Sequence, residues 1–207
     1  MAKVKMNKPF AVKGFNVVSP KGSALWCKAK EPDYTFNAKG DFLCSLVCDP
    51  GEPAVKEFIS KLEELRDIAY DETIETQGEK GKDVKKRPVY SKDFNKEGTA
   101  TGNIVFKFKL GNVSEREPGQ DKITVVDAHK NVLNDIPLVS NGSTIRCVAY
   151  ANPYYMASSK EIGISLMWKK LQIIDLIEYG SGSDFDEEDG FVSDDSVADL
   201  GGDVVDF

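Results

Sequence analysis

The chain has 207 residues, of which 34 are acidic and 27 basic, and its hydrophobic fraction of 41% is sufficient for one packed domain. It contains no run of about 18 apolar residues, so we expect no membrane-spanning helix, and its first residues lack the apolar stretch of a secretion signal. Four cysteines without a CxxC pair and a single histidine predict reduced thiols, no metal site and no cofactor.

The negative charge is concentrated at the end of the sequence. Residues 180–207 carry ten acids and no Lys, Arg or His, whereas the remaining 24 acids are outnumbered by the 27 bases. This segment is rich in Asp, Gly and Ser, so we expect a folded domain over residues 1–179 and a disordered acidic tail over 180–207. A polyanion tethered to a basic domain can occupy the surface that a nucleic acid would bind; the alternative is a tail that only aids solubility.

β-rich segments separated by turn-forming residues recur along the domain, and one helix interrupts them. The segments expected to form strands are residues 10–18, 25–29, 41–48, 104–110, 122–126, 144–150 and 164–177. After the third strand, Pro53 follows a helix start signal, and apolar residues recur every three or four positions from Val55, which predicts a helix ending near Thr76. Residues 78–102 are polar and basic and are predicted to form a long loop. In the last strand we expect a bulge near Lys169 and Lys170.

Several antiparallel strands with one intervening helix favour a small closed barrel. The expected fold class is therefore mainly β: an OB-fold, which is a five-stranded Greek-key barrel, with one inserted long α-helix and the disordered acidic tail. Among small barrels of this kind, the OB-fold is the commonest that binds single-stranded nucleic acid.

Strand periodicity places aromatic and basic side chains on shared faces, because residues two positions apart point the same way. Trp26, Lys28 and Lys30 therefore lie together, opposite the apolar side chains at positions 25, 27 and 29. The natural core face is the apolar one, which leaves the tryptophan among lysines on the outer face. In residues 106–109 the two phenylalanines should face the core, and Lys107 and Lys109 should face outward.

A third strand continues the pattern with another mixture of basic and aromatic residues. Arg146, Val148 and Tyr150 share the face opposite positions 145, 147 and 149. Just beyond this strand, a turn predicted around Pro153 carries Tyr154 and Tyr155. Neighbouring side chains of an extended chain point to opposite sides, so at least one of these two tyrosines should be exposed.

Aromatic rings and lysines on one surface are typical of proteins that bind single-stranded nucleic acid, where bases stack on rings and cations follow the phosphates. The basic segment at residues 80–87 adds further positive charge. An enzyme is disfavoured because the chain shows no GxxxxGK[ST] sequence, no Ser/His/Asp arrangement and no carboxylate cluster for metals. An alternative is an interaction protein whose acidic tail mimics DNA and blocks a partner's nucleic-acid site.

Six short motifs follow one another along the domain, and the sequence closes on the acidic run and Phe207. In chain order the motifs are Glu31-Pro32-Asp33-Tyr34, Phe106-Lys107-Phe108-Lys109, Val125-Val126-Asp127, Asp135-Ile136-Pro137, Asn141-Gly142-Ser143 and Pro153-Tyr154. In the order and spacing of these motifs, the chain resembles the acidic-tailed single-stranded DNA-binding (SSB) proteins of short-tailed phages. The resemblance implies an OB-fold with an inserted helix, roles in phage DNA replication, recombination and repair, a base-stacking role for Tyr154 and DNA contacts by Lys107 and Lys109. Where the family often has an aromatic residue two positions after that tyrosine, this chain has Met156, and Tyr155 is a candidate substitute.

The expected DNA contacts are thus basic and aromatic residues distributed over the domain. They are Lys3, Trp26, Lys28, Lys30, Tyr34, Lys107, Lys109, Arg146, Tyr150, Tyr154 and Tyr155. By the same resemblance, the tail contacts the phage DNA polymerase and helicase-primase through Asp203, Asp206 and Phe207, in the cytoplasm of the infected bacterial host. A homodimer is left open.

Overall fold

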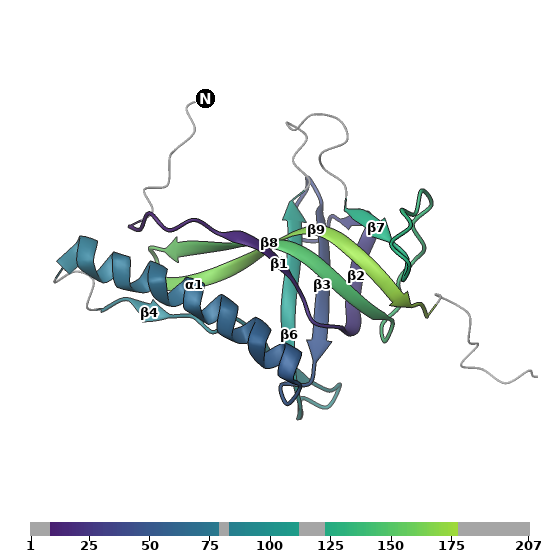
Figure 1. Ribbon diagram of the computed structural model, residues 1–207, viewed down its shortest axis with the longest axis horizontal. Coiled ribbons are helices and arrows are strands. Elements are labelled where there is room, and N and C mark those ends of the chain that lie inside the picture. Colours follow the sequence, from purple (N-terminus) through teal and green to yellow (C-terminus); the bar gives the residue numbers. More distant parts are fainter. Residues whose placement is uncertain (1–8, 79–82, 112–122, 178–207) are drawn as a thin grey trace, which may run out of the picture.

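Five strands close into a ring within the part of the chain that the computed structural model describes, residues 9–78, 83–111 and 123–177 (Figure 1). In order around the ring they are β2 (Gly22–Asp33), β3 (Asp41–Cys48), β6 (Ala100–Gly111), β9 (Glu161–Asp175) and β8 (Thr144–Met156), which pairs again with β2. All neighbours are antiparallel except β6 and β9, which are parallel. The predicted OB-fold barrel is therefore confirmed.

The predicted helix is also confirmed, as α1 (Pro53–Gln77) between β3 and β6. Pro53 occupies the first turn, where its missing N–H is tolerated, and Gly78 ends the helix with a φ of 55°. Val55, Phe58, Leu62 and Leu65 of the apolar stripe are buried, together with Arg66, Ala69 and Thr73. The Phe58 ring meets the Phe106 ring edge-on at 5.0 Å. The helix thereby covers one end of the ring and lies along β8 and β9 where they extend beyond it (Figure 1).

Four short strands extend the sheet, and two of them correct the sequence-based prediction. β1 (Phe15–Val18) pairs with β8, and β7 (Thr124–Val126) pairs with β9. β4 (Lys85–Lys86) pairs with β9 and β5 (Ser91–Phe94) with β6, so the prediction of one continuous loop over residues 78–102 was wrong. These segments are short and polar, and pairing with β9 and β6 is what orders them. The first strand likewise begins at Phe15 and not at residue 10.

β8 continues well past its predicted end. The segment around Pro153 was predicted to be a turn, but it is strand, and Pro153 is the register partner of Ile164 on β9. The β1–β8 ladder ends at Ala151, so among the described strands Pro153 pairs with β9 alone, and a strand with one such partner tolerates proline. The long β8–β9 pair carries Tyr154 and Tyr155 out along α1.

The core fills the ring with the side chains that strand periodicity assigns to it. Phe106 and Phe108 are 0% and 1% exposed, and Trp168 is the largest fully buried side chain. Burying a phenylalanine side chain of this kind contributes about 1.5–3 kcal/mol. A second cluster, formed by Phe10, Ala69, Val84 and Ile162, joins α1 to the extended end of β9. No helix in the described part of the chain is long and apolar enough to cross a membrane.

Candidate nucleic-acid interface

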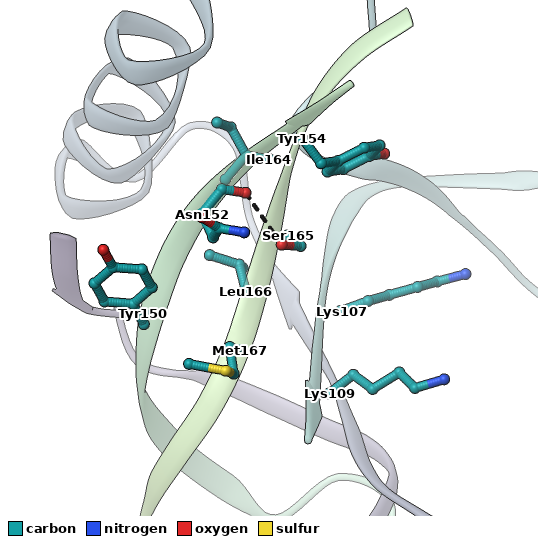
Figure 2. A pocket seen from close by; sticks show the side chains of 9 residues that line it. All are labelled: Lys107, Lys109, Tyr150, Asn152, Tyr154, Ile164, Ser165, Leu166 and Met167. Carbon is teal, nitrogen blue, oxygen red and sulfur yellow. Dashed lines mark hydrogen bonds between the residues drawn. The ribbon is translucent and has the colours of Figure 1, made fainter. Parts of the chain in front are cut away.

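A groove on the outer surface of the ring brings together four of the predicted DNA-contacting residues: Lys107 and Lys109 from β6, and Tyr150 and Tyr154 from β8. It has a volume of about 660 Å³, and β9 forms its floor. The remaining lining residues are Asn152, Ile164, Ser165, Leu166 and Met167. Figure 2 shows the two lysine side chains extending side by side from β6, and the Ser165 hydroxyl donating to the Asn152 carbonyl at 3.1 Å.

Strand alternation is the reason that these side chains face the groove. On β8 the side chains of Ile145, Cys147, Ala149 and Ala151 are fully buried. The residues between them, including Tyr150, are only partly buried and face outward. The same alternation on β6 sends the phenylalanines inward and the lysines outward, as predicted.

Lys109 and Lys107 differ in electrostatic environment. The Lys109 ammonium lies 2.7 Å from the Asp41 carboxylate, which is only 5% exposed and also accepts a hydrogen bond from Asn37 at 3.0 Å. Burial by itself raises the pKa of Asp41, but the hydrogen bonds from Lys109 and Asn37 outweigh it and hold the pKa below its usual range. Lys107 forms no ion pair with any described residue, so its charge is available to a ligand.

The Tyr154 ring lies over Gly163, its register partner on β9. A Cβ atom at Gly163 would come within 2.6 Å of the Tyr154 hydroxyl oxygen and 2.7 Å of ring carbon Cζ. Only a glycine permits this close approach, and it seats the ring at the wall of the groove. Tyr155 points to the other side of β8 and packs against the cluster that joins β9 to α1. Contrary to expectation, neither tyrosine is fully exposed, since each ring packs on one of the two faces of the β8–β9 pair.

Trp26, Lys28 and Lys30 lie in a second groove, of about 450 Å³, between β2 and residues 137–141. Trp26 is 64% exposed, as the lysine-rich outer face predicted. Its φ of 54° is uncommon for a bulky residue and falls at an irregularity in the β2–β3 register. The Asn141 side-chain oxygen fixes this backbone by accepting the Trp26 N–H at 2.8 Å. Lys30 forms a 3.3 Å ion pair with exposed Asp135.

The two grooves lie on one continuous surface. Leu43 on β3 is the register partner of Lys28 on one side and of Lys109 on the other. Lys109 is in turn paired with Met167, and Met167 with Tyr150. Register partners in neighbouring strands share a face, so this row crosses all five strands of the ring from β2 to β8.

The other predicted site residues are more dispersed. Tyr34 is 59% exposed in the β2–β3 connection, with its ring against Gly40. Arg146 is partly buried on the outer face of β8, where its Nε atom is buried and has no hydrogen-bond partner among the described residues. The predictions for Lys3, Asp203, Asp206 and Phe207, and for the tail as a whole, fall outside the described residues.

Sequence reasoning overlooked Phe36, which is 97% exposed in the same connection as Tyr34. The available signal was an apolar ring in the middle of a polar turn. The basic segment at residues 80–87 was expected to add positive charge for DNA binding, but Lys86 is paired with Asp67 and Arg87 with Glu161. These two charges therefore pair with carboxylates of the folded domain.

No group of three or more His, Cys, Asp or Glu side chains in the described ranges is placed to hold a metal ion. The four cysteines are free thiols, and three are buried. The hydrogen bond to Cys44, together with burial, raises the pKa of the Cys27 thiol, so this thiol stays neutral.

Comparison with known proteins identifies phage proteins of one function. The family model described as "Single-stranded DNA-binding protein, Bacteriophage T7" matches residues 22–177. The single-stranded DNA-binding protein of Escherichia phage T7 is 22% identical over an alignment of 169 residues, and the match covers 76% of this chain and 73% of that protein.

Solved structures show the same fold. The crystal structure of gp2.5, the single-stranded DNA-binding protein of bacteriophage T7, superposes with a TM-score of 0.63 at 21% identity, over 87% of this chain and 99% of that one. The single-stranded DNA-binding protein of bacteriophage Enc34, solved in complex with ssDNA, gives a TM-score of 0.52 at 12% identity, over 79% and 88% of the two chains.

The family match spans well over half of the sequence and includes all five strands of the ring. It confirms the resemblance found in the sequence, and it confirms a binding protein in place of an enzyme. The chain belongs to the family of single-stranded DNA-binding proteins typified by that of bacteriophage T7.

Proposed function

We propose that this protein coats and protects single-stranded DNA during phage DNA replication, recombination and repair in the cytoplasm of the infected host, and that the strand binds in the groove beside β6. The observation that carries the site assignment is the convergence of two lysines and two tyrosines, from two strands distant in sequence, on one groove. The bound ssDNA of the Enc34 protein, which has a similar fold, supports the same ligand class.

Each side chain has a distinct role in this proposal. Tyr154, whose ring lies at the groove wall over Gly163, stacks with one unpaired base, an interaction worth roughly 1–3 kcal/mol. Lys107, which has no carboxylate partner among the described residues, contacts a phosphate directly. Lys109 is shared between a phosphate and Asp41, so it contributes less net charge to the strand.

In this proposal the bound DNA strand continues from the first groove over Leu43 toward the second groove. The register row that links Tyr150, Lys109 and Lys28 supports this path, because the row lies on one face of the ring. At its end, the exposed Trp26 ring offers another stacking surface and Lys28 another phosphate contact.

The acidic segment 180–207 competes with DNA for these lysines. The described chain ends at Ile177, whose side chain lies beside Gly142, next to the Asn141 that lines the Trp26 groove. Ten acids begin a few residues later, so their effective concentration at the grooves is high. Once DNA displaces the segment, Asp203, Asp206 and Phe207 are free to recruit the phage DNA polymerase and helicase-primase.

Fluorescence anisotropy with labelled single-stranded and double-stranded oligonucleotides tests the DNA part of the proposal. The full-length protein should prefer the single strand, since stacking needs unpaired bases. Lys107→Ala should weaken binding, while Lys56→Ala, at an exposed lysine of α1 outside both grooves, should not. Equal affinity for both DNA forms, or equal effects of the two substitutions, would refute the site.

A pull-down with purified phage DNA polymerase tests the recruitment part. Phe207→Ala should leave the affinity for ssDNA unchanged and weaken polymerase binding, because the ring is proposed to fill an apolar pocket on the partner. Unchanged polymerase binding by this variant would refute the role of Phe207 while leaving the DNA site untouched.

A further inference from the structure

The last strand of the ring contains a bulge that exposes two consecutive lysines. On β8, Val148 pairs with Lys170 and the next residue, Ala149, pairs with Trp168, so Lys169 is an extra residue on β9. The flanking Trp168 and Leu171 are both fully buried, whereas Lys169 and Lys170 are both exposed. In a regular strand one of two neighbouring lysines would point into the core, and the bulge avoids that cost.

The bulge is held in one conformation from inside the barrel. The indole N–H of buried Trp168 donates to the carbonyl oxygen of Lys170 at 3.0 Å. A buried indole N–H needs a hydrogen-bond acceptor, and here the acceptor is a backbone carbonyl of the bulge itself. The core therefore fixes the backbone from which both lysine side chains leave.

Lys169 is also oriented from outside. Its ammonium donates to the Asn16 side-chain oxygen at 2.8 Å and lies 5.3 Å from the centroid of the Tyr150 ring, within the range of a cation–π interaction. Asn16 and Tyr150 are register partners on β1 and β8, so they present their side chains on the same face. Neither Lys169 nor Lys170 has a carboxylate partner among the described residues, in contrast to Lys109.

We propose that Lys169 and Lys170 form a phosphate subsite that lengthens the ssDNA groove, and that Tyr150 positions Lys169 in it. This inference rests on the proposed function. Tyr150 lines the groove together with Lys107. A DNA strand that runs from Tyr154 past Tyr150 therefore reaches the bulge next. One face of the Tyr150 ring is already covered by an ammonium group, which makes Tyr150 a support for a cation and leaves base stacking to Tyr154.

The salt dependence of ssDNA binding tests the subsite in the full-length protein. For single strands, the slope of log Kobs against log[salt] changes by about 0.7 for each phosphate contact. Lys169→Ala and Lys170→Ala should each reduce the magnitude of the slope by about 0.7, and Lys169→Arg should retain it. Lys56→Ala on α1 is the matched control and should leave the slope unchanged.

Lys107→Ala, measured in parallel, separates this inference from the proposed function. If Lys107→Ala reduces the slope and neither bulge substitution does, the subsite is refuted and the groove stands. If Lys107→Ala and both bulge substitutions leave the slope unchanged, the proposed groove itself is refuted and the subsite with it.

A double-mutant cycle tests the positioning role of Tyr150. Tyr150→Phe keeps the ring face beneath Lys169 and should preserve the slope, whereas Tyr150→Leu should reduce it as much as Lys169→Ala does. In the Lys169→Ala background, Tyr150→Leu should add no further loss of affinity. Additive losses, with a slope that Tyr150→Leu leaves unchanged, would show that Tyr150 acts on the DNA independently and would overturn the positioning role.

Discussion

Replacing Gly163 with alanine should displace the Tyr154 ring without removing it. The new Cβ would lie 2.6 Å from the tyrosine hydroxyl oxygen, 2.7 Å from Cζ and 3.0 Å from Cε1. Carbon atoms in contact are normally about 3.5–4.0 Å apart, so the ring has to move outward by about 1 Å. It can do so, because it is the free end of a surface side chain.

The expected result is a loss of ssDNA affinity in a protein that remains folded. Base–aromatic stacking contributes roughly 1–3 kcal/mol, so displacing the ring should weaken binding by up to that amount, about 5- to 150-fold. Stability should change little or rise slightly, since alanine costs less backbone entropy than glycine in a strand by about 0.5–1 kcal/mol. Thermal unfolding of the free protein checks this second expectation.

The assay is a double-mutant cycle of ssDNA affinity with Gly163→Ala, Tyr154→Ala and the double variant. Without the tyrosine ring, the alanine at position 163 has nothing to displace, so the double variant should bind like Tyr154→Ala. Gly163→Ala with wild-type affinity would show that the seat on Gly163 does not set the stacking position. Two substitutions with additive effects would show that they act independently, and the reasoning would be refuted.

Three further predictions concern other parts of the surface. Because Lys109 lowers the pKa of Asp41, the stability from this pair is present above the unfolded pKa of about 3.9 and is lost as pH falls through the folded pKa. Lys109→Met should therefore lower Tm most at neutral pH, and the difference in Tm from the wild type should narrow below about pH 4. A difference in Tm that stays constant with pH would argue against the ion pair. Of the two tryptophans, Trp26 is exposed and Trp168 buried, so ssDNA should quench intrinsic fluorescence in the wild type but not in Trp26→Phe, and persistent quenching would exclude a stacked Trp26. Truncation of residues 180–207 should tighten ssDNA binding, most at low salt, and weaker binding by the truncated, folded protein would contradict competition.

The strand faces and the helix follow from the sequence alone, because both depend on local periodicity. Alternation in residues 106–109 was sufficient to place the phenylalanines inside and the lysines outside, as the structure has them. The stripe that begins at Val55 gave the helix, and the consecutive Lys169 and Lys170 gave the bulge, since two neighbouring lysines cannot both face outward from a regular strand.

The tertiary structure decided which residues line the groove. Tyr150 and Lys107 belong to strands far apart in sequence, and only closure of the ring, with β9 between β8 and β6, brings them to one surface. Pairing with β9 also turned the segment around Pro153 into strand, which sent Tyr154 to the groove and Tyr155 toward α1. The carboxylate that holds Lys109 is likewise a neighbour from another strand. Periodicity fixes which side of a strand a residue occupies, but its neighbours there depend on non-local pairing and register, which a single sequence does not encode locally.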